Sequence, residues 1–267
     1  MQRIPDFAVI ITAAGRSDRF NKGNEESVKK EYLKTGEHTV LYGATEPFLE
    51  IPGLKTIIIT CPEGSEDETA VALEDIVNIN GLPILIMNGG DSRSQSVKSA
   101  LERLRSLPFD FDYIAIHDGA RPYITPDSII RTLAAATIAG GAAPARRITD
   151  AVKRLGPDGF IEESVDRSSL IRVQTPQIFK ADLLYEAYDR ISEDESYADD
   201  IEVFQKAGFR CTVVQGDESN KKITYKEDIP DADNQIASYI EARKSGRHSA
   251  DAVRRMKELM QERADEE

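Results

Sequence analysis

The stretch Ala8-Val-Ile-Ile-Thr-Ala-Ala-Gly-Arg-Ser-Asp-Arg-Phe20 joins an apolar run to a turn of small residues followed by basic side chains. Residues 8–12 predict a strand covered on both faces, because such strands are continuous apolar runs rich in β-branched residues. The turn Ala13-Ala-Gly15 exposes backbone N–H groups that can surround phosphates. It is neither a Walker A loop nor the Gly-x-Gly-x-x-Gly turn of dinucleotide-binding folds.

The same apolar pattern returns along the chain and alternates with helical periodicity. Further strands are predicted at 56–60, 84–87, 113–117 and 211–215, and helices at 40–49, 67–78, 92–104, 126–139, 183–191, 199–207 and 230–244. Apolar strands separated by helices predict an α/β fold with a doubly wound, mostly parallel sheet. Ligands of such sheets bind beyond the carboxyl ends of the strands.

The pattern changes between residues 146 and 174. A Gly-Pro-Asp-Gly turn at 156–159 between short alternating segments predicts a β-hairpin. A hairpin of this size cannot bury a core alone, so we expect a protruding β-arm that packs on another subunit. We therefore expect a single domain over residues 1–245 and a helical tail over 246–267, with an apolar stripe formed by Val253, Met256, Leu259 and Met260.

The composition fits a globular chain and disfavours several classes of partner. Hydrophobic residues make up 40% and charged residues 30% of the 267 residues, and the net charge is −13. A field of this sign repels nucleic acid and anionic membranes, so we expect neither as a partner. No apolar run approaches the ~20 residues that span a bilayer. The N-terminus lacks the apolar core of a signal peptide, which favours the cytoplasm.

Cysteine and histidine are too sparse for a metal centre or a disulfide framework. Cys61 and Cys211 lie in apolar runs, and we interpret both as reduced core thiols. The three histidines, His38, His117 and His248, are too scattered for a zinc site. His117 is interpreted as a packed residue at a strand end and not as a general base.

The loop after the predicted strand at 84–87 has the composition of a ligand-binding turn. Gly89 and Gly90 allow a ligand to approach the backbone closely. The polar residues that follow offer an acceptor, a fork of donors and a hydroxyl with which a base edge can be read, namely Asp91, Arg93 and Ser96. The same segment also fits a helix N-cap at Asp91 or Ser92, and the two roles are compatible.

A further loop follows the predicted strand at 113–117. Asp118 stands at the carboxyl end of that strand, where a carboxylate can approach a hydrated Mg²⁺ or a sugar hydroxyl. Arg121 is suited to a bidentate grip on phosphate. The expected phosphate site of this acidic chain must therefore be built from a local group of cations.

Taken together, these loops resemble the 2-C-methyl-D-erythritol 4-phosphate cytidylyltransferase family of the non-mevalonate isoprenoid pathway. The resemblance covers approximately residues 7–240, and the order and spacing of its motifs are specific. The motifs are Ala13-Ala-Gly15, the pair Arg19 and Lys30, Gly89-Gly-Asp-Ser-Arg-Ser-Gln-Ser-Val97, His117-Asp-Gly-Ala-Arg-Pro122, Val165-Asp-Arg167, Gln174-Thr-Pro-Gln177 and Asn220-Lys-Lys-Ile-Thr224.

The resemblance implies a Rossmann-like nucleotidyltransferase fold, a homodimer formed through the β-arm, and a reaction between CTP and a sugar-alcohol phosphate. A phosphate oxygen of the acceptor attacks the α-phosphorus of CTP in line and pyrophosphate leaves. Both reactants are anions, so positioning and charge neutralisation should dominate the rate. One Mg²⁺ is expected on the CTP phosphates and is held mainly by the nucleotide, with Asp118 as the one side chain considered for direct contact.

The resemblance also implies roles for individual residues. The catalytic cations are Arg19, Lys30 and Lys222. The CTP-binding residues are Ala14, Gly15, Arg19, Lys30, Gly90, Asp91, Ser96 and Gly119. The acceptor-binding residues are Asp118, Arg121, Arg167, Thr175 and Lys222, with Arg121 and the arm expected to act across a dimer interface.

The chain departs from the family pattern at three places. Segment 21–29 is longer than usual, carries Glu25-Glu26, and has Lys29 where proline commonly stands. Ala151 and Ala198 replace threonines near the acceptor. An acidic insert weakens phosphate binding unless it points away. Two alternatives therefore stay open, a ribitol 5-phosphate cytidylyltransferase and a nucleotide-binding protein of the same fold without catalysis.

Overall fold

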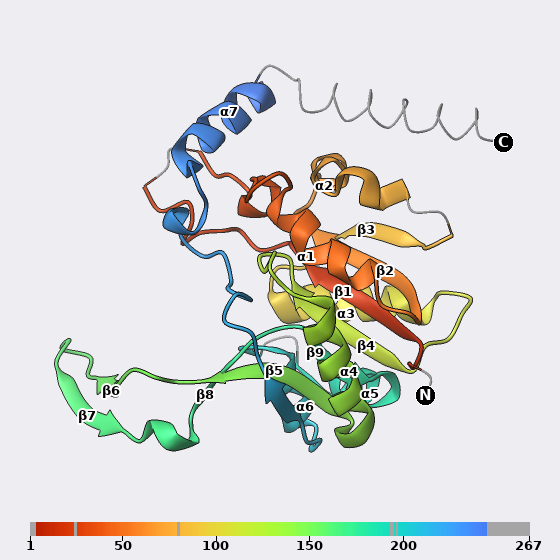
Figure 1. The fold of residues 1–267 in the computed structure, drawn as a ribbon, viewed down its shortest axis with the longest axis vertical. Helices are drawn as coiled ribbons and strands as arrows, with labels where there is room; N and C mark the ends of the chain where they lie inside the picture. The colour runs from red at the N-terminus through yellow and green to blue at the C-terminus, as the bar shows by residue number, and fades with distance from the viewer. Residues whose placement is uncertain (1–3, 24–25, 79–80, 193–194, 196, 245–267) are drawn as a thin grey trace.

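The computed structural model describes residues 4–23, 26–78, 81–192, 195 and 197–244, and these form a large sheet covered by helices with a separate two-stranded arm (Figure 1). The strands are β1 (Phe7–Thr12), β2 (Leu54–Cys61), β3 (Ile84–Asn88), β4 (Tyr113–Asp118), β5 (Gly141–Arg147), β6 (Val152–Leu155), β7 (Ile161–Val165), β8 (Ile171–Val173), β9 (Gln177–Lys180) and β10 (Thr212–Gln215). The helices are α1 (Val40–Leu49), α2 (Glu66–Ala72), α3 (Arg93–Arg105), α4 (Pro126–Ala139), α5 (Ala181–Asp189), α6 (Asp200–Lys206) and α7 (Ala232–Lys244). Four short 3-10 helices complete the described elements, η1 (Lys30–Tyr32), η2 (Glu74–Asn78), η3 (Arg167–Ser169) and η4 (Lys226–Asp228).

The order of the strands places a crevice beside β1. The sheet runs β10-β5-β9-β4-β1-β2-β3, and β8 pairs with β5. Strand β1 pairs in parallel with β2 on one side and with β4 on the other, while β9 runs antiparallel between β4 and β5. The chain builds outward from β1 in both directions, and ligands bind at the carboxyl ends of strands where the order reverses in this way. The predicted doubly wound, mostly parallel sheet is confirmed.

Alternate residues of β1 supply two hydrophobic cores on opposite faces of the sheet. Phe7, Val9 and Ile11 pack with α1, α2 and α4 on one face. Ala8 and Ile10 pack with α3, α5 and α6 on the other face. Because successive side chains of a strand point to opposite faces, a strand that is apolar at every position is buried on both sides. The apolar run that opens the chain therefore determines where both cores lie.

The sequence pattern does not predict three strands of the sheet, β5, β8 and β9, and β8 lies within the segment 146–174 that the sequence assigns to the arm. β5 reads Gly-Ala-Ala-Pro-Ala-Arg-Arg and lacks the β-branched and aromatic residues that favour strands. Small residues are needed there because its neighbours approach closely: a Cβ on Gly141 would lie 3.0 Å from the rings of Phe179 and Phe204. The strand is thus selected by its tertiary surroundings and not by its own propensity.

The helices begin and end within two residues of the predicted positions, except in the predicted helix 67–78. That segment is divided, because α2 ends at Ala72 and Glu74 adopts a left-handed backbone with φ of 55° at the start of η2. At the start of α3, the Ser92 hydroxyl accepts a hydrogen bond from Gln95 N at 3.1 Å, and the Gln95 side chain accepts one from Ser92 N. The predicted N-cap is therefore present at Ser92.

The predicted hairpin is confirmed as an antiparallel pair, β6 and β7, that extends away from the large sheet (Figure 1). Its register places Val152 opposite Val165. Three large apolar side chains of the hairpin are solvent-exposed, Leu155 at 68%, Phe160 at 74% and Ile161 at 67%. An arm with this composition presents apolar surface that this copy of the chain does not cover.

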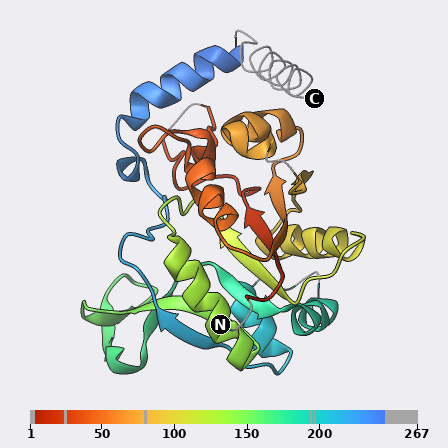
Figure 2. The same cartoon turned by 45° about the vertical axis from the view of Figure 1, so that its right-hand side comes forward.

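A third cluster lies where the C-terminal segment crosses the N-terminal third of the chain, and α7 (blue) lies beside that region (red to orange) in Figures 1 and 2. Phe20, Val28 and Leu33 pack in this cluster with Ile223 and Ile236. The predicted tail, residues 246–267 with its apolar stripe, lies outside the described residues. Neither α7 nor any other described helix has the length and apolar character needed to cross a membrane.

The two cysteines differ in burial. Cys61 is fully buried at the end of β2, and burial raises the pKa of its thiol. Cys211 is half-buried just before the edge strand β10, where burial raises the pKa of its thiol to about 12. The predicted core position holds fully only for Cys61, and that both thiols are reduced remains a prediction.

Candidate active site

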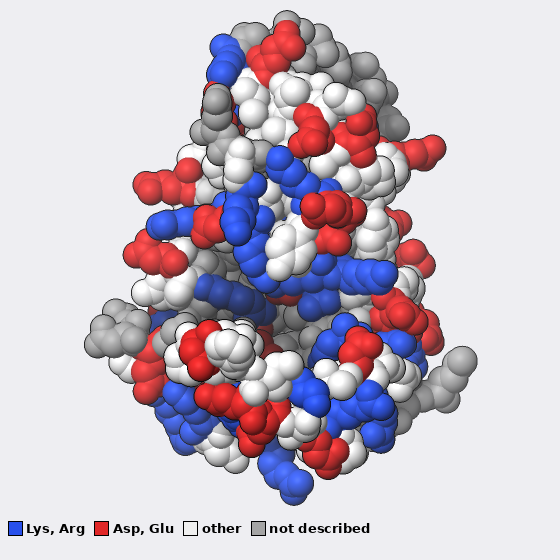
Figure 3. Space-filling view, turned by 90° about the vertical axis from the view of Figure 1, so that its left-hand side faces the viewer, with Lys and Arg blue, Asp and Glu red and all other residues white. Residues whose placement is uncertain are grey.

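A cavity of about 850 Å³ lies at the carboxyl ends of β1, β2, β3 and β4, where the fold places its crevice. Its walls come from the loops that follow these strands, from η1, and from the segment around Lys222. The face seen in Figure 3 is hollowed near its middle, and Lys and Arg side chains gather beside the hollow. Of the predicted site residues, the ones that line the cavity are Ala14, Gly15, Arg19, Lys30, Gly90, Asp91, Asp118 and Lys222.

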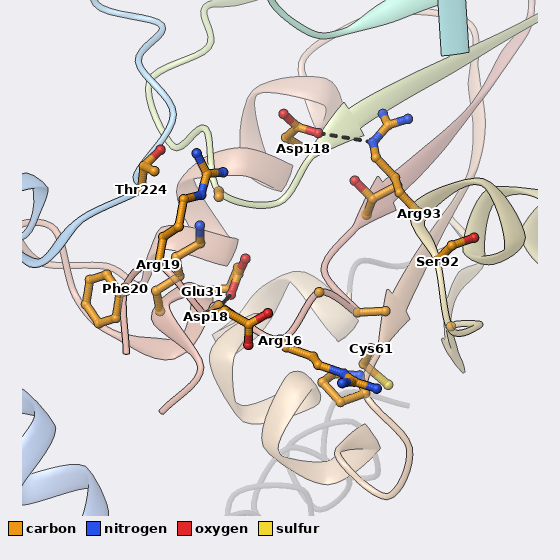
Figure 4. A pocket seen from close by; sticks show the side chains of 18 of the residues that line it. Arg16, Asp18, Arg19, Phe20, Glu31, Cys61, Ser92, Arg93, Asp118 and Thr224 are labelled. Carbon is orange, nitrogen blue, oxygen red and sulfur yellow. Dashed lines mark hydrogen bonds and ion pairs between the residues drawn. The ribbon is translucent and has the colours of Figure 1, made fainter. Parts of the chain in front are cut away.

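The cations of the cavity come from segments that are far apart in sequence. Arg19 belongs to the loop after β1, Lys30 opens η1, and Lys222 precedes η4. Figure 4 shows Arg19 and Thr224 on one side of the cavity, Ser92 and Arg93 on the opposite side, and Asp118 between them. The arrangement provides the local positive charge that an acidic protein needs in order to bind phosphates.

Lys30 is the most deeply placed of the predicted catalytic cations, with only 7% of its surface exposed. Its Nζ donates a hydrogen bond of 2.7 Å to the carbonyl of Ile223, which fixes the ammonium between η1 and the C-terminal segment. Burial lowers the pKa of Lys30; the nearby Glu31 opposes this shift, whereas Lys222 adds to it. An anion entering the cavity would relieve this crowding of positive charge.

Asp118, at the end of β4, is held by several cations at once. Its Oδ2 lies 2.9 Å from Lys222 Nζ and 3.2 Å from Arg121 Nε, and its Oδ1 lies 3.6 Å from Arg93 Nε. Burial alone would raise the pKa of Asp118, but Lys222, Arg93 and Arg121 together hold it well below its usual range. The carboxylate is therefore ionised and orders the cations around it.

The ion pairs of Asp118 affect whether this carboxylate can also bind a metal ion. Within the part of the chain that the structure describes, no group of three or more His, Cys, Asp or Glu side chains is placed to hold a metal ion. Both carboxylate oxygens of Asp118 already face cations, so Asp118 is poorly suited to bind Mg²⁺ directly. The described residues therefore do not make a metal site of the protein's own.

The loop after β3 is built for close approach to a ligand. A Cβ on Gly89 would lie 2.3 Å from the Ala14 Cβ, and a Cβ on Gly90 would lie 2.6 Å from the Gln95 Cβ. Ser96 does not line the cavity; its hydroxyl accepts a hydrogen bond of 3.0 Å from Gly90 N and so holds this loop from behind. Only glycine fits at 89 and 90, which brings the backbone of this loop to the cavity wall.

Four other predicted residues lie outside the cavity wall. Gly119 packs under it, because a Cβ there would lie 3.0 Å from the Ala13 Cβ. Arg121 reaches the site through its ion pair with Asp118. Thr175 is buried behind Asp118 and accepts a hydrogen bond of 3.1 Å from Asp118 N. Arg167 lies on the arm and donates to the carbonyl of Thr149, so the structure of one chain does not bring it to the cavity.

His117 is fully buried at the end of β4, as the sequence predicts. Its Nδ1 shares a hydrogen bond of 2.9 Å with the Thr175 hydroxyl, and its Nε2 lies 3.2 Å from the carbonyl of Arg121. Burial lowers the pKa of His117 to about 4, so the ring is neutral at pH 7. It supports the loop that carries Asp118 and does not face the cavity.

The long segment after Arg19 forms a side loop that closes on itself. The Asn21 side chain accepts a hydrogen bond from Val28 N at 2.9 Å and donates one to the Val28 carbonyl at 2.9 Å. Glu26, within this loop, pairs with Lys244 of α7 at 2.5 Å. Glu26 is thus directed to α7 and not to the cavity, while Glu25 lies outside the described residues.

Sequence reasoning did not find the buried carboxylate that holds Arg93 from behind. Arg93 lies between Asp118 and Asp200, and its Nη2 is 2.6 Å from Asp200 Oδ2. Asp200 is fully buried and accepts a second hydrogen bond of 2.6 Å from the Tyr188 hydroxyl. Arg93 already stood out as a fork of donors, but the partner at position 200 becomes visible only when α6 is placed beside α3.

Comparison with known proteins agrees with this geometry. Residues 7–238 match the family model described as 2-C-methyl-D-erythritol 4-phosphate cytidylyltransferase. The 2-C-methyl-D-erythritol 4-phosphate cytidylyltransferase of Cereibacter sphaeroides is 36% identical over 231 residues, which cover 86% of this chain and 96% of that protein. The crystal structure of the enzyme of the same name from Thermus thermophilus has a TM-score of 0.66 at 25% identity and covers 89% of this chain and 99% of that one.

Another set of relatives is longer than this chain. The bifunctional enzyme IspD/IspF of Rhodopseudomonas palustris (strain BisB5) is 32% identical over 242 residues, which cover 90% of this chain. The chain spans 58% of the length of that relative.

A doubly wound sheet with a cavity lined by loops and cations at its switch point defines the class, a Rossmann-like nucleotidyltransferase fold. Within that class, the chain belongs to the 2-C-methyl-D-erythritol 4-phosphate cytidylyltransferase family.

Proposed function

We propose that the protein joins CTP to 2-C-methyl-D-erythritol 4-phosphate, giving the CDP-methylerythritol product and pyrophosphate. The observation that carries this proposal is the convergence of Arg19, Lys30 and Lys222 on one cavity whose wall includes the close-packed Gly89-Gly90 loop. The glycine loop offers backbone groups for a base, and the cations offer charge for phosphates. Family membership supports the same substrates.

In this reaction a phosphate oxygen of the acceptor attacks the α-phosphorus of CTP, the new P–O bond forms, and the bond to pyrophosphate breaks. No proton has to be removed, because the attacking phosphate is already ionised. The protein therefore acts by positioning two anions and by neutralising the charge of the transition state. Arg19 and Lys30 would neutralise the CTP phosphates, and Lys222 would bring the acceptor phosphate to the α-phosphorus.

The acceptor would lie against Asp118 and its cations. Lys222 is the predicted acceptor contact that both lines the cavity and pairs with Asp118, so it stands between the two substrates. The loss of the threonine hydroxyls at Ala151 and Ala198 is compatible with this position. Both alanines are exposed, and neither lines the cavity.

We infer that the protein works as a homodimer through the β-arm. Arg167 is expected to touch the acceptor, yet in one chain it lies on the arm outside the cavity wall. The exposed Leu155, Phe160 and Ile161 give the arm an apolar surface that suits a second copy of the chain. Arg167 would then act on the partner subunit's site.

A divalent cation is expected on the nucleotide itself. The described residues offer no carboxylate cluster, so Mg²⁺ would be held by the CTP phosphates and would add charge neutralisation there. The predicted single domain over residues 1–245 and the cytoplasmic location both remain predictions.

The test of the proposed function is pyrophosphate release from CTP and Mg²⁺, with 2-C-methyl-D-erythritol 4-phosphate and ribitol 5-phosphate in parallel reactions. Turnover with the first acceptor alone is the expected result. Turnover with ribitol 5-phosphate alone would leave the CTP site in place and overturn the acceptor assignment. No turnover by folded protein with either acceptor would favour a nucleotide-binding protein without catalysis.

A further inference from the structure

A buried ion pair lies at the cavity wall and has no part in the mechanism described so far. Lys29 and Glu31 flank Lys30, and they are 9% and 5% exposed. Lys29 Nζ lies 3.1 Å from Glu31 Oε2 and also donates a hydrogen bond to the carbonyl of Gly15 in the turn after β1. Glu31 lines the cavity, whereas Lys29 does not.

The same pair is connected to a strained part of that turn. Ser17 adopts a left-handed backbone with φ of 57°, a conformation that side chains other than glycine rarely adopt. Its hydroxyl donates a hydrogen bond of 3.4 Å to Glu31 Oε2. Lys29 and Glu31 thus hold the turn at two points, at the Gly15 carbonyl and at the Ser17 side chain.

The contact with Gly15 determines how the peptide between Gly15 and Arg16 is oriented. In a planar trans peptide, the carbonyl of one residue and the N–H of the next point in opposite directions. Since the Gly15 carbonyl is held by Lys29, the Arg16 N–H points away from Lys29, and both Gly15 and Arg16 line the cavity. A backbone N–H in this position is a donor for a phosphate oxygen.

We propose that Lys29, paired with Glu31, is a positioning residue that presents the Gly15–Arg16 peptide to the phosphates of the bound nucleotide. A buried ammonium that only balanced Glu31 would need no contact with the turn, and Lys29 makes one. The group that Lys29 orients is the Arg16 N–H, which lies beyond the residues expected to contact the base, namely Ala14, Gly15 and the adjoining Gly89-Gly90 loop, so the role concerns the phosphates. The inference rests on the proposed nucleotide site but not on the identity of the acceptor.

The experiment compares the wild-type protein with Lys29→Met, Lys29→Arg and the double variant Lys29→Met/Glu31→Gln. Isothermal titration measures the binding of cytidine, of CTP with Mg²⁺, and of inorganic triphosphate, and thermal melting checks the fold. In Lys29→Met we expect triphosphate and CTP to bind about tenfold more weakly, the size expected for one hydrogen bond to a charged group. Cytidine should bind within about twofold of the wild type, since its contacts lie elsewhere.

Two variants separate positioning from charge balance. Lys29→Arg keeps a donor for the Gly15 carbonyl and should restore most of the phosphate binding. The double variant leaves no unpaired buried charge, so it should fold even if Lys29→Met does not, and it should still bind triphosphate weakly because the Gly15 contact is gone. Lys55→Met, which breaks the surface pair between Lys55 of β2 and Asp6, is the matched control and should change nothing.

Equal weakening of cytidine and CTP in folded Lys29→Met would overturn the proposal, because it would indicate a general structural role. Unchanged triphosphate binding, or full recovery in the double variant, would overturn it as well. Failure of the proposed function is separable: a wild-type protein without turnover still reports on Lys29 through its binding of inorganic triphosphate.

Discussion

Arg19 and Lys30 act, in our proposal, through their charge at the phosphates of CTP. We predict that Arg19→Ala and Lys30→Ala each lower kcat about 10²- to 10³-fold, the range seen when one preorganised donor to a transition state is removed. The loss arises because the transition state carries more charge at these positions than the substrate does. Steady-state kinetics, CTP titration and thermal melting together check the prediction.

The control for this pair is Arg103→Ala, since Arg103 is an exposed arginine of α3 that donates to Ser106 at its own helix end and does not line the cavity. It should keep full turnover. If Arg19→Ala or Lys30→Ala folded, bound CTP and turned over at the wild-type rate, the catalytic assignment would be wrong. Loss of turnover with CTP binding retained would also argue against a purely nucleotide-binding protein.

His117 makes stability depend on pH. Its ordinary pKa of 6.5 is lowered by burial to about 4, so between these values the unfolded chain binds a proton that the folded protein does not. The free energy of unfolding therefore falls as the pH drops from 6.5 toward 4, by about 3 kcal/mol, and this histidine adds no further loss below that range. At pH 7 this loss is absent, because the ring is neutral in both the folded and the unfolded chain.

Denaturant unfolding at pH 7 and at pH 4 measures this dependence. His117→Gln should lose about 3 kcal/mol less than the wild type between the two pH values, because the group that titrates is gone. His38→Gln is the matched control, because it removes a half-exposed surface histidine in place of the buried one. An unchanged slope in His117→Gln would show that other groups carry the acid sensitivity.

Residue chemistry was predictable from sequence where a side chain follows directly after an apolar strand. Arg19, Lys30 and Asp118 stand in or next to loops at strand ends, and those ends meet at one edge of a parallel sheet. Arg93 and Asp200 were not assigned as a pair, because more than 100 residues separate them along the chain and only the packing of α3 and α6 on the same face of the sheet brings them together. Arg167 remains unplaced in the site, since a single chain does not bring it there.

At the scale of elements, the β-arm extends away from the large sheet, and its large apolar side chains are exposed to solvent. We predict that Leu155→Asp combined with Phe160→Asp converts the dimer to a monomer, because these exposed side chains would supply the apolar contact with the second copy. Light scattering after gel filtration measures the mass. The KM for the acceptor should rise in the same variant, because Arg167 would no longer reach the partner subunit's site.

Ile138→Asp is the control for the arm, since Ile138 on α4 is 89% exposed and lies outside the arm. It should leave the mass unchanged. A wild-type protein that is already monomeric at assay concentrations would contradict the homodimer proposal, and an arm variant that stays dimeric would place the interface elsewhere.

The elements that sequence reasoning missed share one physical cause. The strand β5 is rich in small residues, and β8 and β9 have only three and four residues, so their own patterns are too weak or too short to predict a strand. They form because neighbouring strands of the sheet supply hydrogen bonds. The break after Ala72 has the same character, since a single left-handed residue, Glu74, turns a continuous helical pattern into two pieces. A local sequence pattern indicates which secondary structure a segment favours, and in these segments the tertiary surroundings determine the structure instead.

At the scale of the whole molecule, one sheet carries two cores that share the same strands. Phe7, Val9 and Ile11 face one core while Ala8 and Ile10 face the other, so neither core can open without disturbing β1. We predict a single cooperative unfolding transition for the described part of the chain. Because the chain contains no tryptophan, tyrosine fluorescence and far-UV circular dichroism are the probes, and their denaturant midpoints should coincide. Different midpoints from the two probes would contradict the prediction of a single domain over residues 1–245.

The sequence by itself determined the class of fold, the edge of the sheet where the cavity lies, and the residue types that meet there. It could do so because strand burial and strand-end loops are local features, and because parallel strands present their carboxyl ends at one edge. Only the tertiary structure decided which charges neutralise one another: Lys222 and Arg121 on Asp118, Lys29 on Glu31 and Gly15, and Glu26 turned to α7. The energies of charge pairing and desolvation depend on how close the groups lie in the folded structure. The separation of two residues along the chain does not determine that distance.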